Sequence, residues 1–286
     1  MKKNKLIAPF LKWVGGKRQL MPAINELLPK KYSTYYEPFV GGGAVLFEIQ
    51  PKKAIINDFN SELVNTYNVI KNQPEELIED LKTHVNESEY FYNIRALDRQ
   101  EDFDELSDVK KASRVIYLNK TCYNGLYRVN NSGEFNSPFG KYKNPNIVND
   151  VTIRAVSKYF NANDITIING DFENAVKNIR KGAFVYFDPP YDPVSKSSNF
   201  TGYVQGGFNM FDQVRLRDLC DKLDKQGVKF LVSNSATQLI LDLYSKYNIT
   251  FVKANRAINS DASKRGEVDE VLIRNYEWYK KRHCLE

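Results

Sequence analysis

The segment AFVYFDPPY, residues 183–191, is an apolar run that ends in an acid, two prolines and a tyrosine. A short apolar run bounded in this way is typical of a buried strand. Because each proline fixes its own φ angle and donates no backbone N–H, we expect two hydrogen-bond acceptors at the strand's end, the Asp188 carboxylate and the Pro189 carbonyl. With Tyr191 beside them, they predict a pocket at the carboxyl edge of a sheet.

Two acceptors next to an aromatic ring suit a flat ligand with an exocyclic amino group, such as a nucleobase turned out of its duplex. The alternative is structural: Asp188 caps the following helix, and the prolines only end the strand. The residues of this turn do not separate the two interpretations by themselves.

Strands alternate with helical patterns along most of the chain, which predicts an α/β domain with a mostly parallel sheet. The predicted strands begin near Tyr35 and continue at residues 53–57, 164–169, 183–187 and 228–233. Helices are expected from Ala44, after Asp58 with Ser61 as the cap, and over residues 212–226 with Gly227 at the end.

Residues 60–150 differ from the rest of the chain because they carry long, charged helical patterns. Pro74 is expected to open one such helix, whose apolar face holds Leu77, Ile78, Leu81 and Val85. We therefore predict a catalytic domain made of residues 1–60 and 150–286, and an inserted helical domain over residues 61–149.

A glycine run, Gly41-Gly42-Gly43, follows the first predicted strand. It matches only part of the dinucleotide-binding pattern because Leu46 replaces the third glycine, which disfavours an NAD or FAD site. Asp58 follows Gly41 at close to the ~20-residue spacing at which an acid binds ribose hydroxyls. A nucleoside cofactor without a pyrophosphate fits this pattern.

The composition sets limits on the class of protein. A net charge of +6 and a pI of about 8.9 are compatible with a polyanionic partner, although they do not identify one. No apolar run is long enough to span a bilayer, and no signal peptide is evident, so we expect a cytoplasmic protein. Three scattered cysteines and two histidines predict neither a disulfide framework nor a metal site.

Several motifs occur in a fixed order: FLKWVGGK at 10–17, EPFVGGG at 37–43, YNGLYR at 123–128, FNSPFG at 135–140, DPPY at 188–191 and DEVL at 269–272. In this order they resemble the Dam-type adenine-N6 DNA methyltransferases of class alpha, in particular the DpnM-like enzymes. The resemblance extends over nearly the whole chain. It implies a Rossmann-like, S-adenosylmethionine-dependent methyltransferase fold with an inserted helical DNA-recognition domain.

The resemblance also implies the reaction and its residues. S-adenosylmethionine would give its methyl group to the N6 amino group of adenine in double-stranded DNA, by base flipping and direct in-line transfer, without a metal. The implied catalytic residues are Asp188, Pro189, Pro190 and Tyr191. The implied cofactor-binding residues are Trp13, Lys17, Gly41, Gly43, Asp58, Asp171, Phe172 and Asp188.

DNA recognition is expected in the inserted segment, where cations alternate with aromatic residues and amides. The implied DNA-binding residues are Lys12, Tyr123, Asn124, Leu126, Arg128 and Pro138. In the family, the Arg128 position reads a guanine, and the implied site is GATC. A monomer associated with the nucleoid is the expected state, and one role left open is the modification half of a restriction–modification pair with a cognate endonuclease.

Three alternatives remain at this point: an amino methyltransferase acting on cytosine-N4, RNA or protein, a binding module without catalysis, and a nucleotide-dependent oxidoreductase.

Two further segments are expected to be loops. Residues 192–209 would form a lid after the catalytic turn, and residues 255–266 would contact phosphates.

Overall fold

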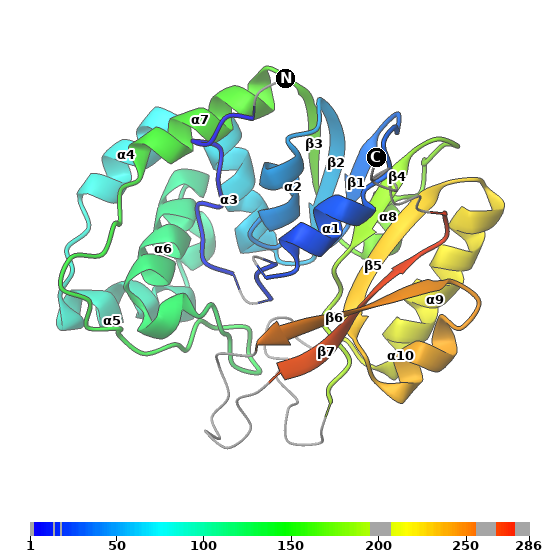
Figure 1. Ribbon diagram of the computed structural model, residues 1–286. Coiled ribbons are helices and arrows are strands. Elements are labelled where there is room, and N and C mark those ends of the chain that lie inside the picture. Colours follow the sequence, from blue (N-terminus) through cyan, green and yellow to red (C-terminus); the bar gives the residue numbers. More distant parts are fainter. Residues whose placement is uncertain (1–2, 14, 18, 195–206, 256–266, 278–286) are drawn as a thin grey trace, which may run out of the picture.

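The structure is a computed structural model that describes residues 3–13, 15–17, 19–194, 207–255 and 267–277. The two predicted loops at 192–209 and 255–266 lie for the most part outside these residues. Figure 1 shows a sheet with helices on both faces and, beside it, a body of helices formed by the middle of the chain.

The sheet has seven strands in the order β3-β2-β1-β4-β5-β7-β6. They are β1 (Tyr35–Glu37), β2 (Lys53–Asp58), β3 (Asp164–Asn169), β4 (Phe184–Phe187), β5 (Lys229–Ser235), β6 (Asn248–Asn255) and β7 (Glu267–Arg274). The pairs among β3, β2, β1, β4 and β5 are parallel, whereas β7 runs antiparallel to both β5 and β6. The predicted α/β class and the mostly parallel sheet are confirmed.

The strand order reverses between β1 and β4, since the chain builds outward from β1 to β3 and then resumes on the other side at β4. In open α/β sheets, ligands bind in the crevice at the carboxyl ends of the strands where this reversal occurs. The glycine run follows β1 and the DPPY turn follows β4, so both motifs lie at this crevice.

The described helices surround the sheet and form the helical body. They are α1 (Met21–Leu27), α2 (Ala44–Ile49), α3 (Ser61–Asn72), α4 (Pro74–Lys82), α5 (Ser88–Ala96), α6 (Asp108–Thr121), α7 (Asp150–Asn161), α8 (Phe172–Ala175), α9 (Met210–Lys225) and α10 (Gln238–Leu243). Three short 3-10 segments are η1 (Leu97–Arg99), η2 (Phe103–Glu105) and η3 (Tyr123–Gly125).

Two predictions about helix ends were wrong. Asn60, not Ser61, caps α3, because the Asn60 side chain accepts a hydrogen bond from the Leu63 N–H at 2.9 Å. Val85 lies beyond the end of α4 and is 44% exposed, so it is not part of the helix's apolar face. A helix begins where a side chain reaches its free N–H groups, and Asn60 does so one residue earlier than predicted.

Each face of the sheet has its own core. The side chains of Tyr35, Ile56 and Phe184 pack with α1, α2, α3 and α7 on one face. The alternate side chains of the same strands, such as Val185 and Phe187, pack with α8, α9 and α10 on the other. A third core, of Phe91, Tyr117, Leu118, Cys122, Tyr127 and Phe135, joins α5 and α6 to the segment that follows them.

Polar side chains fix the loops at the carboxyl edge of the sheet. Buried Asn57 at the end of β2 donates to the carbonyls of Pro38 and Gly170, both at 2.9 Å, and so ties together the loops after β1 and β3. At Gly43, φ is +73° and a Cβ would lie 2.7 Å from the Tyr67 hydroxyl, so only glycine fits there. These contacts hold the loops that line the crevice.

Candidate active site

The DPPY turn presents a salt bridge at the end of β4. Asp188 Oδ2 lies 2.8 Å from Lys17 Nζ, and Asp188 Oδ1 accepts a hydrogen bond of 2.8 Å from Ser233 Oγ on β5. Lys17 Nζ also donates to the Gly15 carbonyl and lies 4.7 Å from the centroid of the Tyr191 ring. The predicted catalytic residues Asp188 and Tyr191 and the predicted cofactor residue Lys17 thus form one cluster.

Buried amides hold the backbone of this turn. Gln213 Nε2 on α9 donates to the Pro190 carbonyl at 3.0 Å, and Asn234 Oδ1 on β5 accepts from the Asp192 N–H at 3.0 Å. Among the described residues, none donates a hydrogen bond to the Pro189 carbonyl. The turn therefore keeps one carboxylate and one carbonyl available as acceptors in a fixed geometry.

The protein surroundings shift the pKa values of Asp188 and Tyr191. Burial raises the pKa of Asp188, while the Lys17 ammonium and the Ser233 hydroxyl lower it. Burial also raises the pKa of Tyr191 well above its usual range, and its hydroxyl donates to Glu270 Oε2 on β7 at 3.2 Å. This bond orients a ring that stays neutral at ordinary pH.

Glu37 is a buried acid at the end of β1 that the sequence reasoning missed. It accepts a hydrogen bond of 2.8 Å from the Tyr35 hydroxyl, and burial raises its pKa well above the usual range. Asp188 raises that pKa further, and Lys17 lowers it. Ser233 was also missed, although its position at the end of an apolar run, like that of Asp188, was a signal available in the sequence.

The other wall of the crevice carries Asp58 and the glycine run. Asp58 Oδ2 accepts from the Gly41 N–H, and Oδ1 accepts from the Asn60 N–H, both at 3.0 Å. Trp13 packs on the glycines, because a Cβ at Gly41 would lie 2.9 Å from Trp13 Cδ1. The structure thus brings together Trp13, Gly41 and Asp58, which the sequence had placed in one cofactor site.

Aromatic rings form the apolar end of this wall. Phe39 stacks on Phe172 with ring centroids 5.3 Å apart, and Phe172 is buried. Asp171 caps α8 and pairs with Arg215 at 3.1 Å, so its carboxylate is held by the protein. Phe59, directly after Asp58, is 58% exposed and was missed; an aromatic residue next to a strand-ending acid was the signal for it.

The model of the family described as D12 class N6 adenine-specific DNA methyltransferase matches residues 13–258. The chain belongs to this family. The match includes the glycine run, Asp58 and the DPPY turn, so the methyltransferase motifs coincide with the crevice described above.

The sequences of relatives match this methyltransferase over nearly its whole length. Type II methyltransferase M1.LlaDCHI from Lactococcus lactis subsp. cremoris is 49% identical over 279 residues, which cover 96% of this chain and 98% of that protein. Type II methyltransferase M.MjaIII from Methanocaldococcus jannaschii is 43% identical, with 94% and 99% covered. The DNA adenine methylase of Escherichia coli strain K12 is 34% identical, with 95% of each chain covered.

The predicted family and enzyme class are therefore confirmed: the chain is an adenine-specific DNA methyltransferase. Membership implies S-adenosylmethionine as the methyl donor, and the seven-stranded α/β architecture is consistent with the methyltransferase fold. Within the described ranges, no group of three or more His, Cys, Asp or Glu side chains is arranged to hold a metal. No described helix is long and apolar enough to cross a membrane.

The predicted DNA-binding residues of the methyltransferase gather around η3. Tyr123 is 58% exposed, its N–H donates to the Pro138 carbonyl at 2.8 Å, and Asn124 has a φ of +57°. Lys12 joins this group because a Cβ at Gly125 would lie 2.8 Å from Lys12 Cδ. Leu126 is half-buried, and Arg128 begins the next strand-like segment.

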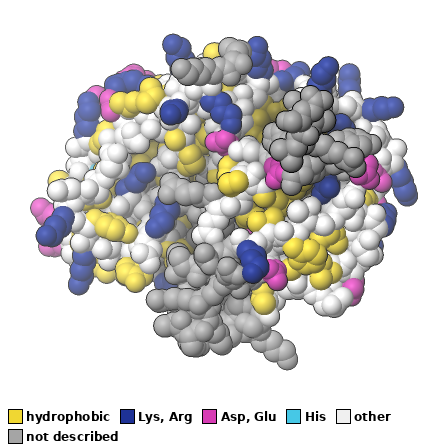
Figure 2. All heavy atoms as spheres, viewed as in Figure 1, with side chains coloured by type: hydrophobic (Ala, Val, Ile, Leu, Met, Phe, Trp, Pro, Cys, Tyr) yellow, Lys and Arg dark blue, Asp and Glu magenta, His cyan; other side chains and the backbone are white. Residues whose placement is uncertain are grey.

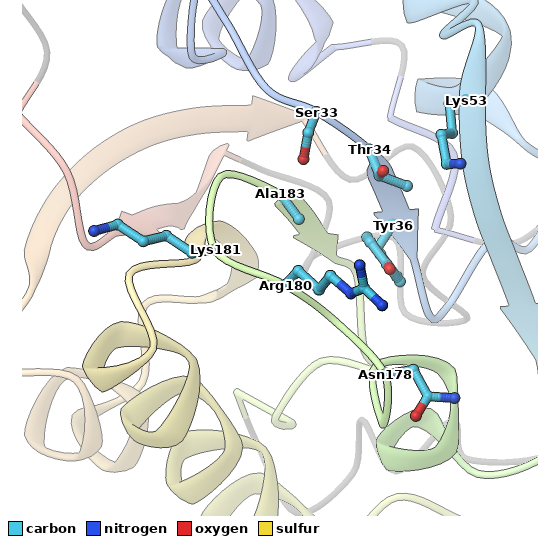
Figure 3. A pocket seen from close by; sticks show the side chains of 8 residues that line it. All are labelled: Ser33, Thr34, Tyr36, Lys53, Asn178, Arg180, Lys181 and Ala183. Carbon is cyan, nitrogen blue, oxygen red and sulfur yellow. The ribbon is translucent and has the colours of Figure 1, made fainter.

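One further hollow lies on the described part of the methyltransferase, away from the DPPY turn. Figure 2 shows Lys and Arg side chains spread over the viewed face. A hollow of about 610 Å³ is lined by Ser33, Thr34, Tyr36, Lys53, Asn178, Arg180, Lys181 and Ala183 (Figure 3). All of these residues except Tyr36, the second residue of β1, lie at or before the starts of β1, β2 and β4, so this hollow is at the sheet edge opposite to the DPPY turn.

Proposed function

We propose that the enzyme methylates the N6 amino group of adenine within GATC in double-stranded DNA, after the adenine has been flipped into the pocket of the DPPY turn. The observation that carries this proposal is the fixed turn itself. The Asp188 carboxylate, the Pro189 carbonyl and the Tyr191 ring occupy one side of the crevice whose other side holds the glycine run and Asp58.

The residues on the cofactor side fit S-adenosylmethionine. The Asp58 carboxylate would accept hydrogen bonds from ribose hydroxyls. The exposed Phe59 ring and the Phe39–Phe172 stack offer an apolar place for a purine. Lys17, which pairs with Asp188, would lie near the methionine end of the cofactor. Trp13, Gly41, Gly43 and Asp171 complete the proposed cofactor set. Bound S-adenosylmethionine supplies an activated methyl group on a sulfonium.

The chain's own residues hold and polarise the amino group. Asp188 and the Pro189 carbonyl would each accept a hydrogen bond from one N–H of the amino group. These two bonds increase electron density at the nitrogen and fix the orientation of the amino group. Tyr191, oriented by Glu270, would stack on the adenine ring, and Pro190 keeps the turn in place through Gln213. An adenine inside a duplex cannot reach acceptors in a crevice, and flipping is therefore part of the proposal.

DNA recognition is proposed for the helical domain over residues 61–149 together with Lys12, with residues 1–60 and 150–286 forming the catalytic domain. Tyr123, Asn124, Leu126, Arg128 and Pro138 would contact the site, and Arg128 would read a guanine. Two relatives are called Type II methyltransferases, which supports a role beside a cognate restriction endonuclease. We further propose a monomer that works in the cytoplasm on nucleoid DNA.

The test is tritiated methyl transfer from S-adenosylmethionine to two duplexes that differ only at the guanine of GATC, followed by nucleoside analysis. Label in N6-methyladenine on the GATC duplex alone is expected. Label on both duplexes would remove the GATC assignment, and label only in cytosine would replace the target base. The absence of label on either duplex would direct the search to RNA and protein substrates.

The catalytic role of the turn is tested in the same assay. Asp188→Ala should lower turnover by at least about a hundredfold, the scale of losing one group that stabilises a transition state, while cofactor binding partly survives. Asp164→Ala, which removes an exposed acid from the opposite edge of the sheet, is the matched control and should be active. Near-normal turnover of Asp188→Ala would contradict the proposed mechanism.

A further inference from the structure

Residues 128–136 form a small hairpin in the helical body. Val129 and Phe135 make an antiparallel bridge, the Asn136 N–H donates to the Arg128 carbonyl at 2.9 Å, and Gly133 turns the chain with a φ of +83°. Arg128 and Asn136 are therefore direct neighbours across the hairpin. This pairing is invisible in the sequence, where the two residues belong to separate motifs.

Asn136 binds one edge of the Arg128 guanidinium. Arg128 Nε donates to Asn136 Oδ1 at 2.6 Å, and Arg128 Nη2 donates to the Asn136 carbonyl at 3.3 Å. A guanidinium is a planar fork with two donor edges. Since Nε and Nη2 make up the side edge, the end edge formed by Nη1 and Nη2 still has donors that no described residue takes up.

The segment that carries Asn136 is itself anchored on both sides of this residue. The Phe135 N–H donates to Asp98 Oδ2 at 2.7 Å, and the Phe135 carbonyl accepts from Arg99 Nη2 at 2.8 Å. The Ser137 carbonyl accepts from Arg95 Nη1 at 3.3 Å. Asn136 thus stands between two residues whose backbones are tied to α5 and η1, and it can hold the guanidinium in place.

We propose that Asn136 is the positioning residue that sets base specificity, because it fixes the side edge of Arg128 and leaves the end edge aimed at the O6 and N7 acceptors of a guanine. Bidentate binding of a guanine requires this end edge to lie in the plane of the base. The inference rests on the proposed function, in which Arg128 reads a guanine of the recognition site.

The experiment compares kcat/KM on a GATC duplex with kcat/KM on the same duplex carrying 7-deazaguanine, which lacks the N7 acceptor, and the ratio of the two measures guanine reading. Asn136→Ala should lower this ratio at least fivefold, mainly through slower methylation of the GATC duplex. Asn136→Asp keeps an acceptor oxygen in place and should retain the ratio.

Two further variants protect the comparison. If Asn136→Ala does not fold, Asn136→Ser replaces it in the comparison. The serine side chain is too short to place its hydroxyl at the position of Oδ1, so the same lowering of the ratio is expected. Ser132→Ala removes an exposed hydroxyl from the turn of the same hairpin and should leave the ratio unchanged. In an Arg128→Ala background, Asn136→Ala should have no additional effect on the ratio.

Each other outcome would overturn the inference in a recognisable way. If Asn136→Ala slows both duplexes equally, or if Asn136→Asp is as defective as alanine, Asn136 supports the fold and does not aim Arg128. If Arg128→Ala leaves the ratio at the wild-type value, Arg128 does not read the guanine, and the proposed recognition itself fails. If the ratio falls in Arg128→Ala but not in Asn136→Ala or Asn136→Ser, Arg128 reads the guanine without help from Asn136. The proposed function then stands, and only this inference is wrong.

Discussion

At the scale of single residues, burial disfavours the ionised form of Asp188, and two neighbouring side chains favour it. Burial raises its pKa, and Lys17 at 2.8 Å together with Ser233 at 2.8 Å lowers it. Only the ionised form accepts hydrogen bonds at both oxygens, so the proposed chemistry requires a deprotonated Asp188. Its two supports therefore matter most near the acid end of the activity range.

The pH profile of Ser233→Ala follows from this balance. Activity should fall as pH decreases through the Asp188 pKa, and removing a hydrogen bond that lowers this pKa should move the acid limb of kcat/KM to higher pH, by roughly half to one pH unit. The measurement is kcat/KM between pH 5 and pH 9. Ser245→Ala, on the surface of the molecule, serves as the control, and an acid limb that stays in place or moves to lower pH would contradict the expectation.

Glu37 gives a second residue-scale prediction, for stability. Its pKa is raised in the folded state, so its carboxyl binds a proton more tightly in the folded than in the unfolded protein. This proton binding stabilises the fold fully below the ordinary glutamate pKa, and the stabilisation is lost as pH rises through the raised pKa. Glu37→Gln stays neutral and can still accept from Tyr35. Its free energy of unfolding should exceed that of the wild type by roughly 1–3 kcal/mol at pH 8, and this difference should be smaller at pH 5.

Urea denaturation at the two pH values tests this, with Glu76→Gln on the exposed side of α4 as the control. Equal stability of Glu37→Gln and wild type at pH 8 would mean that Lys17 and Tyr35 fully compensate the buried charge.

At the scale of elements, the hairpin at residues 128–136 depends on a buried arginine of the helical body. Arg114 on α6 is 2% exposed; it pairs with Asp98 at 2.6 Å and with Glu62 at 3.2 Å, and it donates to the carbonyls of Ile94 and Arg95. Asp98 in turn holds the hairpin at the Phe135 N–H. One buried ion network thus links α3, α5, α6 and the hairpin.

Breaking this network should be costly, because it removes the buried cation that pairs with Asp98 and Glu62 and leaves the carbonyls of Ile94 and Arg95 without their side-chain donor. Arg114→Met is expected to lower the free energy of unfolding by about 3–5 kcal/mol, as measured by urea denaturation. Arg154→Met removes an exposed arginine that pairs with Glu75 and should cost no more than about 1 kcal/mol. Similar losses in the two variants would show that the network does not anchor the hairpin.

The elements that the sequence predicted well are those defined by local pattern. The strands at 53–58 and 184–187 follow from short apolar runs, and α9 follows from helical spacing ended by Gly227. What could not be predicted depends on pairing across the sheet or the hairpin. Ser233 reaches Asp188 only because β5 lies beside β4, and Asn136 reaches Arg128 only because the hairpin closes.

At the scale of the whole molecule, residues 10–13 lie between the two proposed binding sites. On one side Trp13 packs on Gly41 and Gly42 of the cofactor wall. On the other side the Lys12 backbone exchanges two hydrogen bonds with the Asn119 side chain of α6, at 2.9 and 2.8 Å. We therefore expect that a ligand that orders this segment from one side changes the free energy of binding on the other.

Tyr127 is the residue through which we expect this coupling to act. Its ring stacks on Trp13 with centroids 4.8 Å apart, and its hydroxyl donates at 2.7 Å to Glu62 in the first turn of α3, just after the Asp58 loop. Saturating S-adenosylhomocysteine should tighten binding of a GATC duplex about tenfold, within the usual range of such couplings. Tyr127→Leu should bring that factor close to one, whereas Tyr127→Phe keeps the stacked ring and should retain part of it.

Fluorescence anisotropy of a labelled duplex, with and without S-adenosylhomocysteine, gives the coupling factor directly as the ratio of the two Kd values. Tyr247→Leu removes a tyrosine that packs against Phe230 on the opposite face of the sheet, and it should leave the ratio unchanged while lowering stability. If Tyr127→Leu binds the duplex more weakly but keeps the wild-type ratio, the stack supports the recognition segment without transmitting cofactor binding, and the two sites communicate through Asn119 or not at all.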